Sequence, residues 1–175
     1  PLPEDAVTNE DLYLYGMHLE QYHHATYLPD DYYLEGLKRD ATDIRINNAY
    51  GTLLMRRGRL TKAEEHLKAA VKKLTLLNPN PYDGEPCYNL GVCQRLLGKR
   101  DEAYDSLYKA TWNAAQQQGA FYALACICAE KGHFFAALEH VEHALVRNSH
   151  NMKARMLKTV LLRKLGQIQK TLEYA

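Results

Sequence analysis

Four glycines recur at nearly regular intervals along this chain, and their spacing constrains the fold more than any other feature. Gly98, Gly132 and Gly166 follow one another at intervals of 34 residues, and Gly58 precedes Gly98 by 40 residues. A fixed period of this length indicates a repeated structural unit. The six extra residues fall within 78–86, where two Asn-Pro steps and an Asp-Gly step predict a loop.

Small and large apolar residues also keep one spacing through three successive repeats. A small residue is followed after 12 positions by Ala and after a further 7 by another Ala, with a large aliphatic residue between the two Ala. The three sets are Gly51, Ala63, Leu67 and Ala70; Gly91, Ala103, Leu107 and Ala110; and Ala125, Ala137, Val141 and Ala144. Small residues are needed where two helices cross closely. The spacing therefore predicts pairs of closely crossing helices, and Ala103→Leu is expected to destabilise the fold by ~1–3 kcal/mol.

This pattern resembles the tetratricopeptide repeat (TPR), a helix-turn-helix unit in which a glycine ends the first helix. The resemblance implies an all-α fold, a right-handed α-solenoid, formed by 1–175 as a single TPR domain. The implied repeats are roughly 10–41, with Met17 in place of the helix A glycine, 44–83 with the inserted loop 78–86, 84–117, 118–151 and an incomplete 152–175. The expected helices are 10–24, 30–39, 43–57, 61–77, 84–97, 101–114, 118–131, 135–147, 151–165 and 168–174.

Three strings are also similar to TPR segments of large bacterial proteins with an N-terminal β-rich module that resembles carbohydrate-active domains. They are GMHLEQY at 16–22, NPNPYDGEPCY at 78–88 and DEAYDSLYKATWN at 101–113. The chain begins at Pro1 and ends in an apolar, helix-like run, so we expect a fragment of a longer protein.

Charge and composition exclude several classes of partner. The chain has 22 Lys and Arg against 21 Asp and Glu, a net charge of +1, so neither a nucleic acid nor a membrane surface is an expected partner. No apolar run is long enough to span a bilayer, and the start lacks the features of a signal peptide. Four cysteines with largely apolar neighbours are typical of buried hydrophobic residues in a reducing compartment, which predicts a cytoplasmic protein.

Residues that could support catalysis or bind a metal are few. His140 and His143 have a spacing suited to two metal ligands, but a third ligand is not apparent, and the neighbouring glutamates favour an exposed polar face. Cys126 and Cys128 point in different directions on a helix, which argues against chelation. Phosphate-binding loops and catalytic motifs are also missing from the sequence. We therefore expect no cofactor and no metal, and no enzymatic activity from this fragment, while that of the full-length protein stays open.

The first helices of the repeats are expected to form a concave groove, as in TPR proteins. With residue 44 as the first position of its repeat, positions 2, 5, 9 and 12 face this groove. The predicted groove residues include Arg45, Asn48, Thr52, Tyr88, Arg95, Tyr122, Lys153 and Arg163. Aromatic residues flanked by basic ones suit an extended peptide or a domain with aromatic, apolar and some acidic character. Ordinary helix packing explains the two tyrosines equally well.

The inserted loop is the second candidate contact surface. Its three prolines restrict the backbone, and Tyr82 is expected to pin it against helix 61–77, so that Tyr82, Asp83 and Glu85 form a rim beside the groove. Two functions remain open. The chain is a protein-interaction scaffold that binds a peptide or partner domain in the groove, or an accessory domain docked on a carbohydrate-active catalytic module of the same polypeptide.

Overall fold

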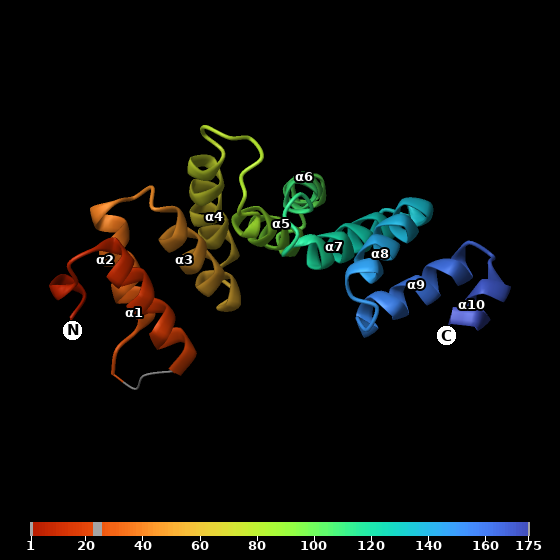
Figure 1. The fold of residues 1–175 in the computed structure, drawn as a ribbon, viewed down its shortest axis with the longest axis horizontal. Coiled ribbons are helices and arrows are strands. Elements are labelled where there is room, and N and C mark those ends of the chain that lie inside the picture. Colours follow the sequence, from red (N-terminus) through yellow and green to blue (C-terminus); the bar gives the residue numbers. More distant parts are fainter. Residues whose placement is uncertain (1, 23–25, 175) are drawn as a thin grey trace. The chain divides into compact units, whose positions relative to one another are not determined.

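The computed structural model describes residues 2–22 and 26–174 (Figure 1). Within these ranges the chain forms one short 3-10 helix and ten α-helices, and no strand. The predicted all-α class is confirmed. Among the described helices, none combines the length and the apolar character that a membrane span requires.

The chain divides into two compact units, Pro1–Pro81 and Tyr82–Ala175. The first unit contains η1 (Pro3–Asp5), α1 (Asn9–Tyr22), α2 (Pro29–Arg39), α3 (Ile44–Arg56) and α4 (Leu60–Leu74). The second contains α5 (Glu85–Leu96), α6 (Arg100–Ala110), α7 (Gln117–Glu130), α8 (Phe134–Arg147), α9 (Met152–Lys164) and α10 (Ile168–Tyr174). Whether the two units form the single predicted domain stays a prediction.

Each odd-numbered α-helix pairs with the even-numbered helix that follows it. Within each unit, successive odd-numbered helices also contact one another: α1 with α3, α5 with α7, and α7 with α9. We call the odd-numbered helices the A helices and the even-numbered ones the B helices. The contacts among A helices place them side by side, which is the arrangement that a shared A-helix surface needs.

The four periodic glycines end the A helices in the manner expected from the sequence. Gly58, Gly98, Gly132 and Gly166 have φ between 72° and 79°, the left-handed conformation that favours glycine. The residue after each glycine donates its N–H to a carbonyl five residues back, as from Lys99 to Gln94 at 2.9 Å. This is the hydrogen bond of a Schellman cap, so the predicted helix caps are confirmed.

The small residues lie where A and B helices cross. Ala103 and its equivalents in the neighbouring repeats are fully buried, together with Leu67, Leu107 and Val141. A Cβ added at Gly91 would lie 2.5 Å from Cγ of Leu107, so this position has no room for a side chain. The predicted close crossing is thus confirmed in the regular repeats.

In the first repeat the helix A glycine is Gly16, and the assignment of Met17 to that position was wrong. Gly16 is buried against the ring of Tyr33, where an added Cβ would overlap the ring. Tyr33 thereby takes the place that Leu67 has in the next repeat, and its hydroxyl donates to Glu20 Oε1 at 2.6 Å. The larger aromatic side chain obscured the repeat in the sequence.

Two helices, α4 and α6, end three and four residues earlier than predicted. α4 ends at Leu74 rather than 77, and Leu77 is 95% exposed, so it has no core contact to extend the helix. α6 ends at Ala110 rather than 114, and beyond this end the side chain of Asn113 bonds to the loop backbone. The predicted end of the first helix at residue 24 lies outside the described residues.

Candidate functional site

The A helices of the second unit carry most of the predicted groove residues. Tyr88 of α5 is half-buried, and a Cβ added at Gly119 of α7 would lie 2.9 Å from its Oη. Tyr122 of α7 is also half-buried and packs with Leu157 of α9 against the core. Both tyrosines therefore hold neighbouring A helices together while keeping part of each ring exposed to solvent.

Arg95, also a predicted groove residue, is engaged within the protein. Its Nη2 lies 2.7 Å from Glu130 Oε1, and Nε of Arg100 lies 2.9 Å from Glu130 Oε2. Hydrogen bonds from Arg95 and then Arg100 lower the pKa of the Glu130 carboxyl. Because Glu130 ends α7, this ion pair links consecutive repeats and leaves Arg95 less available to a partner.

The α9 residues of the predicted groove differ from those of α5 and α7. Lys153 and Arg163 are exposed and form no ion pair with any residue that the structure describes. Met156 is 67% exposed and Val160 is 55% exposed. Of the predicted groove positions in the second unit, those on α9 are therefore the most open to an incoming chain.

In the first unit, α3 carries three further predicted groove residues. Arg45 forms an ion pair with Glu10 of α1, and its guanidinium lies 5.3 Å from the centre of the Tyr13 ring. Asn48 and Thr52 are half-buried, and the Thr52 hydroxyl donates to the Asn48 carbonyl at 2.7 Å. Polar groups on this A helix are thus partly satisfied by the protein itself.

The loop is held by its backbone and not, as expected, by the Tyr82 ring. The Tyr82 carbonyl accepts a hydrogen bond from the Asn113 side chain, and Asp83 Oδ1 accepts one from the Glu85 N–H at 2.9 Å. Gly84 is buried beside Asn113, where an added Cβ would lie 2.6 Å from Cβ of Asn113. The side chain of Tyr82 is 97% exposed, so the expectation that it pins the loop was wrong.

His140 is buried, contrary to the expected exposed face, whereas His143 is exposed as predicted. Nε2 of His140 lies 3.1 Å from the Tyr104 hydroxyl, and burial lowers the pKa of the imidazole. Rings of His143 and Phe121 stack with centres 4.9 Å apart. Position 140 faces the interior because it follows the buried Ala137 by almost one helical turn.

Groups of at least three His, Cys, Asp or Glu that could hold a metal are absent from the part of the chain that the structure describes. Cys128 is buried and Cys126 half-buried, and burial raises the pKa of both thiols. Raised thiol pKa values are unfavourable for nucleophilic chemistry at neutral pH.

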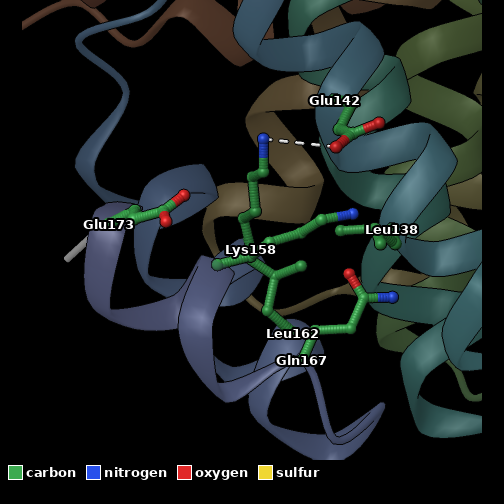
Figure 2. A pocket seen from close by; sticks show the side chains of 7 residues that line it. Leu138, Glu142, Lys158, Leu162, Gln167 and Glu173 are labelled. Carbon is green, nitrogen blue, oxygen red and sulfur yellow. Dashed lines mark ion pairs between the residues drawn. The ribbon is translucent and has the colours of Figure 1, made fainter.

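A pocket of about 480 Å³ between α8, α9 and α10 was not predicted. Figure 2 shows Lys158 of α9 directed towards Glu142 of α8, with Nζ and Oε1 3.2 Å apart. The lining residues are Leu138, Glu142, Lys158, Leu162, Gln167, Lys170 and Glu173. A smaller pocket of about 270 Å³ includes Tyr104 and Cys128, which precede Leu138 and Leu162 by one 34-residue period. The two pockets therefore lie at equivalent positions of successive repeats, beside the B helices. The 34-residue period of the sequence could have predicted that one pocket implies the other.

Comparison with solved structures identifies the architecture. The fold matches Pseudomonas aeruginosa PilF, with a TM-score of 0.81 and 17% sequence identity over 95% of this chain and 73% of that one. It also matches MamA from Desulfovibrio magneticus, with a TM-score of 0.78 and 14% identity over 97% and 92% of the two chains. YrrB, described as a TPR protein with an unusual peptide-binding site, has a TM-score of 0.75 and 15% identity over 94% and 81%.

No protein-family model matches the sequence. The structural likeness agrees with the Schellman-capped A helices, the small residues at each helix crossing and the 34-residue period. The chain therefore has the tetratricopeptide repeat fold.

Proposed function

We propose that this chain is a protein-interaction scaffold that binds a peptide or partner domain on the surface of its A helices. The observation that carries the proposal is the A-helix surface of the second unit, where half-buried tyrosines lie beside exposed apolar and basic residues. Aromatic rings with one buried face provide contact area at little entropic cost. The peptide-binding site in the description of YrrB supports the same use of this fold.

Catalysis by this chain is not part of the proposal. Burial raises the pKa of the Cys87, Cys126 and Cys128 thiols and lowers the pKa of the His140 imidazole. We propose a cytoplasmic protein, which suits four free cysteines packed in or near the core. The partner is a protein, a peptide or another domain of the same polypeptide, and neither a nucleic acid nor a membrane.

Site-specific photo-crosslinking tests this surface. A photoreactive amino acid replaces Val92, which is half-buried on α5, and in a matched variant it replaces Tyr108, which is 49% exposed on α6. We expect a discrete cross-linked partner from position 92 and none from position 108, and the purified partner should then bind the unmodified chain. Equal cross-linking from both positions would contradict an A-helix site.

The second candidate is an accessory domain docked through the inserted loop on a catalytic module of the same polypeptide. It is favoured by the side chain of Tyr82, which is almost fully exposed although the adjoining backbone is anchored to Asn113. Tyr82→Ala should leave the melting temperature of this chain unchanged and weaken its association with the separately expressed remainder of the parent protein. Unchanged association would exclude Tyr82 as the docking residue, and removal of six residues from 78–83 would then test the rest of the loop.

A further inference from the structure

The pocket of about 270 Å³ beside α6, α7 and α8, here called the Tyr104 crevice, combines an aromatic ring with apolar and charged groups. Its uncharged lining is the half-buried ring of Tyr104 on α6, the buried Cys128 on α7 and the half-buried Ala136 on α8. The crevice is smaller than the pockets that hold drug-sized ligands. It therefore has room for one small group and not for a segment of a partner chain.

The charged side chains of the Tyr104 crevice leave one carboxylate unbalanced. Asp101 and Lys131 form an ion pair with each other, so their charges cancel. Asp105 lies one turn after Asp101 on α6 and also lines the crevice, but it forms no ion pair with any residue that the structure describes. His133 lines the crevice as well, and its side chain is exposed. This balance of charge favours a cation as ligand.

A second carboxylate, that of Glu139 on α8, lies close to the same ring. Glu139 follows Ala136 by three residues, which places both on one face of α8. Burial is the main cause that raises the pKa of the Tyr104 phenol, and the charges of Glu139 and Asp105 add to it. The residue one period after Glu139, Glu173, lines the equivalent pocket. Carboxylates from two helices thus act on Tyr104.

The first unit shows how such a set of groups holds a guanidinium. The Arg45 guanidinium pairs with the carboxylate of Glu10, and its central carbon lies 5.3 Å from the centre of the Tyr13 ring. A guanidinium is planar and weakly hydrated, so it can stack on an aromatic ring and pair with a carboxylate at the same time. The Tyr104 crevice offers the ring and, in Asp105, the carboxylate, and no arginine is among its described lining residues.

We propose that the Tyr104 crevice binds a small free organic cation, an alkylguanidinium. Its planar head lies against the Tyr104 ring and pairs with Asp105 and Glu139, and its short alkyl chain contacts Cys128 and Ala136. This inference goes beyond the proposed scaffold function, because the crevice lies beside the B helices and takes a small molecule. Failure of either proposal therefore leaves the other intact.

Propylguanidinium and its neutral isostere N-propylurea test the site. In a two-dimensional NMR titration at constant ionic strength, propylguanidinium should shift the amide signals of residues 101–105 and 128–136. The expected Kd is on the order of 1 mM, which is ordinary for so small a ligand. N-propylurea has the same shape without the charge, so it should bind about tenfold more weakly or not at all.

Charge is tested by exchange of single carboxylates for amides. Asp105→Asn should weaken the binding of propylguanidinium about fivefold or more, and Glu139→Gln about twofold. The matched control is Asp31→Asn on α2, because Asp31 precedes Tyr33 by two residues as Asp105 precedes Leu107, and both aspartates are exposed. This control should bind within about 1.5-fold of the original chain, since only the general field changes.

The ring and the shape of the crevice are tested separately. Tyr104→Phe keeps the ring and should bind within about twofold, whereas Tyr104→Leu should weaken binding about threefold or more. Ala136→Leu fills the crevice and should abolish binding with no change in charge. Circular dichroism melts verify that each variant is folded. Asp105→Asn alters an exposed side chain, so the main test does not depend on the buried positions.

Equal weakening by Asp105→Asn and Asp31→Asn would reduce the effect to net charge and overturn the proposal. Absence of amide shifts, or equal binding of propylguanidinium and N-propylurea, would overturn it as well. The blocked tripeptide Gly-Arg-Gly distinguishes a free cation from an arginine side chain of a partner. If this peptide binds about tenfold more tightly than propylguanidinium, the occupant is a partner's arginine and the assignment to a free cation fails.

Discussion

Each of the two units has a histidine at the same position of the repeat, but the imidazole nitrogens of the two histidines have different partners. His66 of α4 and His140 of α8 each follow a fully buried alanine, Ala63 and Ala137, by three residues. In the first unit, Nδ1 of His66 lies 2.9 Å from Oδ1 of Asn47 on the paired A helix. In the second unit, Phe121 takes the position equivalent to Asn47, and Nδ1 of His140 is buried without a partner among the described residues.

The comparison shows how a repeat exchanges a polar contact for an aromatic one. Asn47 also donates to the carbonyls of Ala41 and Asp43, so it ties His66 to the start of α3. Phe121 stacks with His140 at a centre separation of 6.1 Å, while Tyr104 satisfies the other imidazole nitrogen. The first site depends on one connected set of hydrogen bonds, whereas the second depends on ring packing and tolerates one unsatisfied nitrogen.

Asn47→Leu should have the largest effect on this comparison. Loss of the amide leaves the Ala41 carbonyl and His66 Nδ1 without their side-chain partner, while the Asp43 carbonyl keeps the backbone N–H of residue 47. We expect this to cost about 2 kcal/mol in unfolding free energy. The equivalent replacement Phe121→Leu keeps an apolar side chain and should cost about 1 kcal/mol. Urea unfolding followed by circular dichroism measures both. Equal losses would show that Asn47 acts only by filling space.

The pH dependence of stability should reveal both histidines. Burial lowers the pKa of His66 and of His140, so each imidazole binds a proton less readily in the folded than in the unfolded chain. The stability that depends on these two neutral imidazoles is therefore fully present above the ordinary histidine pKa of about 6.5. It is lost as the pH falls from that value towards the lower pKa of the folded state. Glu65 and Glu139 oppose these shifts, and Lys62 and His143 reinforce them.

Urea unfolding at a series of pH values between neutral and mildly acidic measures this dependence. His140→Leu should reduce the loss of stability on acidification to the part that is due to His66. The double variant that also carries His66→Leu should lose almost no stability over this pH range. A double variant as sensitive to acid as the original chain would assign the effect to other groups.

Phe121→Asn converts the second site to the chemistry of the first. The new amide oxygen would accept from His140 Nδ1–H, as Asn47 does from His66, and should raise the pKa of His140 towards its ordinary value. Loss of ring packing and gain of a hydrogen bond oppose one another, so the net change in stability should stay within about 1 kcal/mol. NMR titration of the imidazole measures the pKa, and an unchanged value would show that position 121 does not reach Nδ1.

His143→Ala should have the smallest effect. Its ring is exposed and stacks on Phe121, an interaction that contributes about 0.5 kcal/mol. The melting temperature should fall only slightly, by an amount that disappears when Phe121 is already replaced by Leu. A large loss in the single variant would mean that His143 supports the buried His140 directly.

The sequence predicted the repeat through residues whose role is fixed by backbone geometry. Gly98 must be a glycine because its φ is 78°, and Gly91 must be small because Leu107 fills the adjacent space. The burial of His140 was missed because Glu139 and Glu142 made its helix face look polar, although its equivalence to His66 was available in the period. The exposure of Tyr82 could not be deduced, because it depends on a hydrogen bond to Asn113, about thirty residues away in the chain.

The guanidinium of Arg39, the last residue of α2, holds the segment around η1 against that helix. Its Nη1 donates to the Ala6 carbonyl at 2.7 Å, its Nη2 reaches the Pro3 carbonyl at 3.3 Å, and its Nε is held by Glu35 at 2.9 Å. A segment fastened in this way does not fray independently of the helix that fastens it. Amide hydrogen exchange in residues 5 and 6, whose N–H groups bond within the η1 turn, should therefore slow to the opening rate of α2.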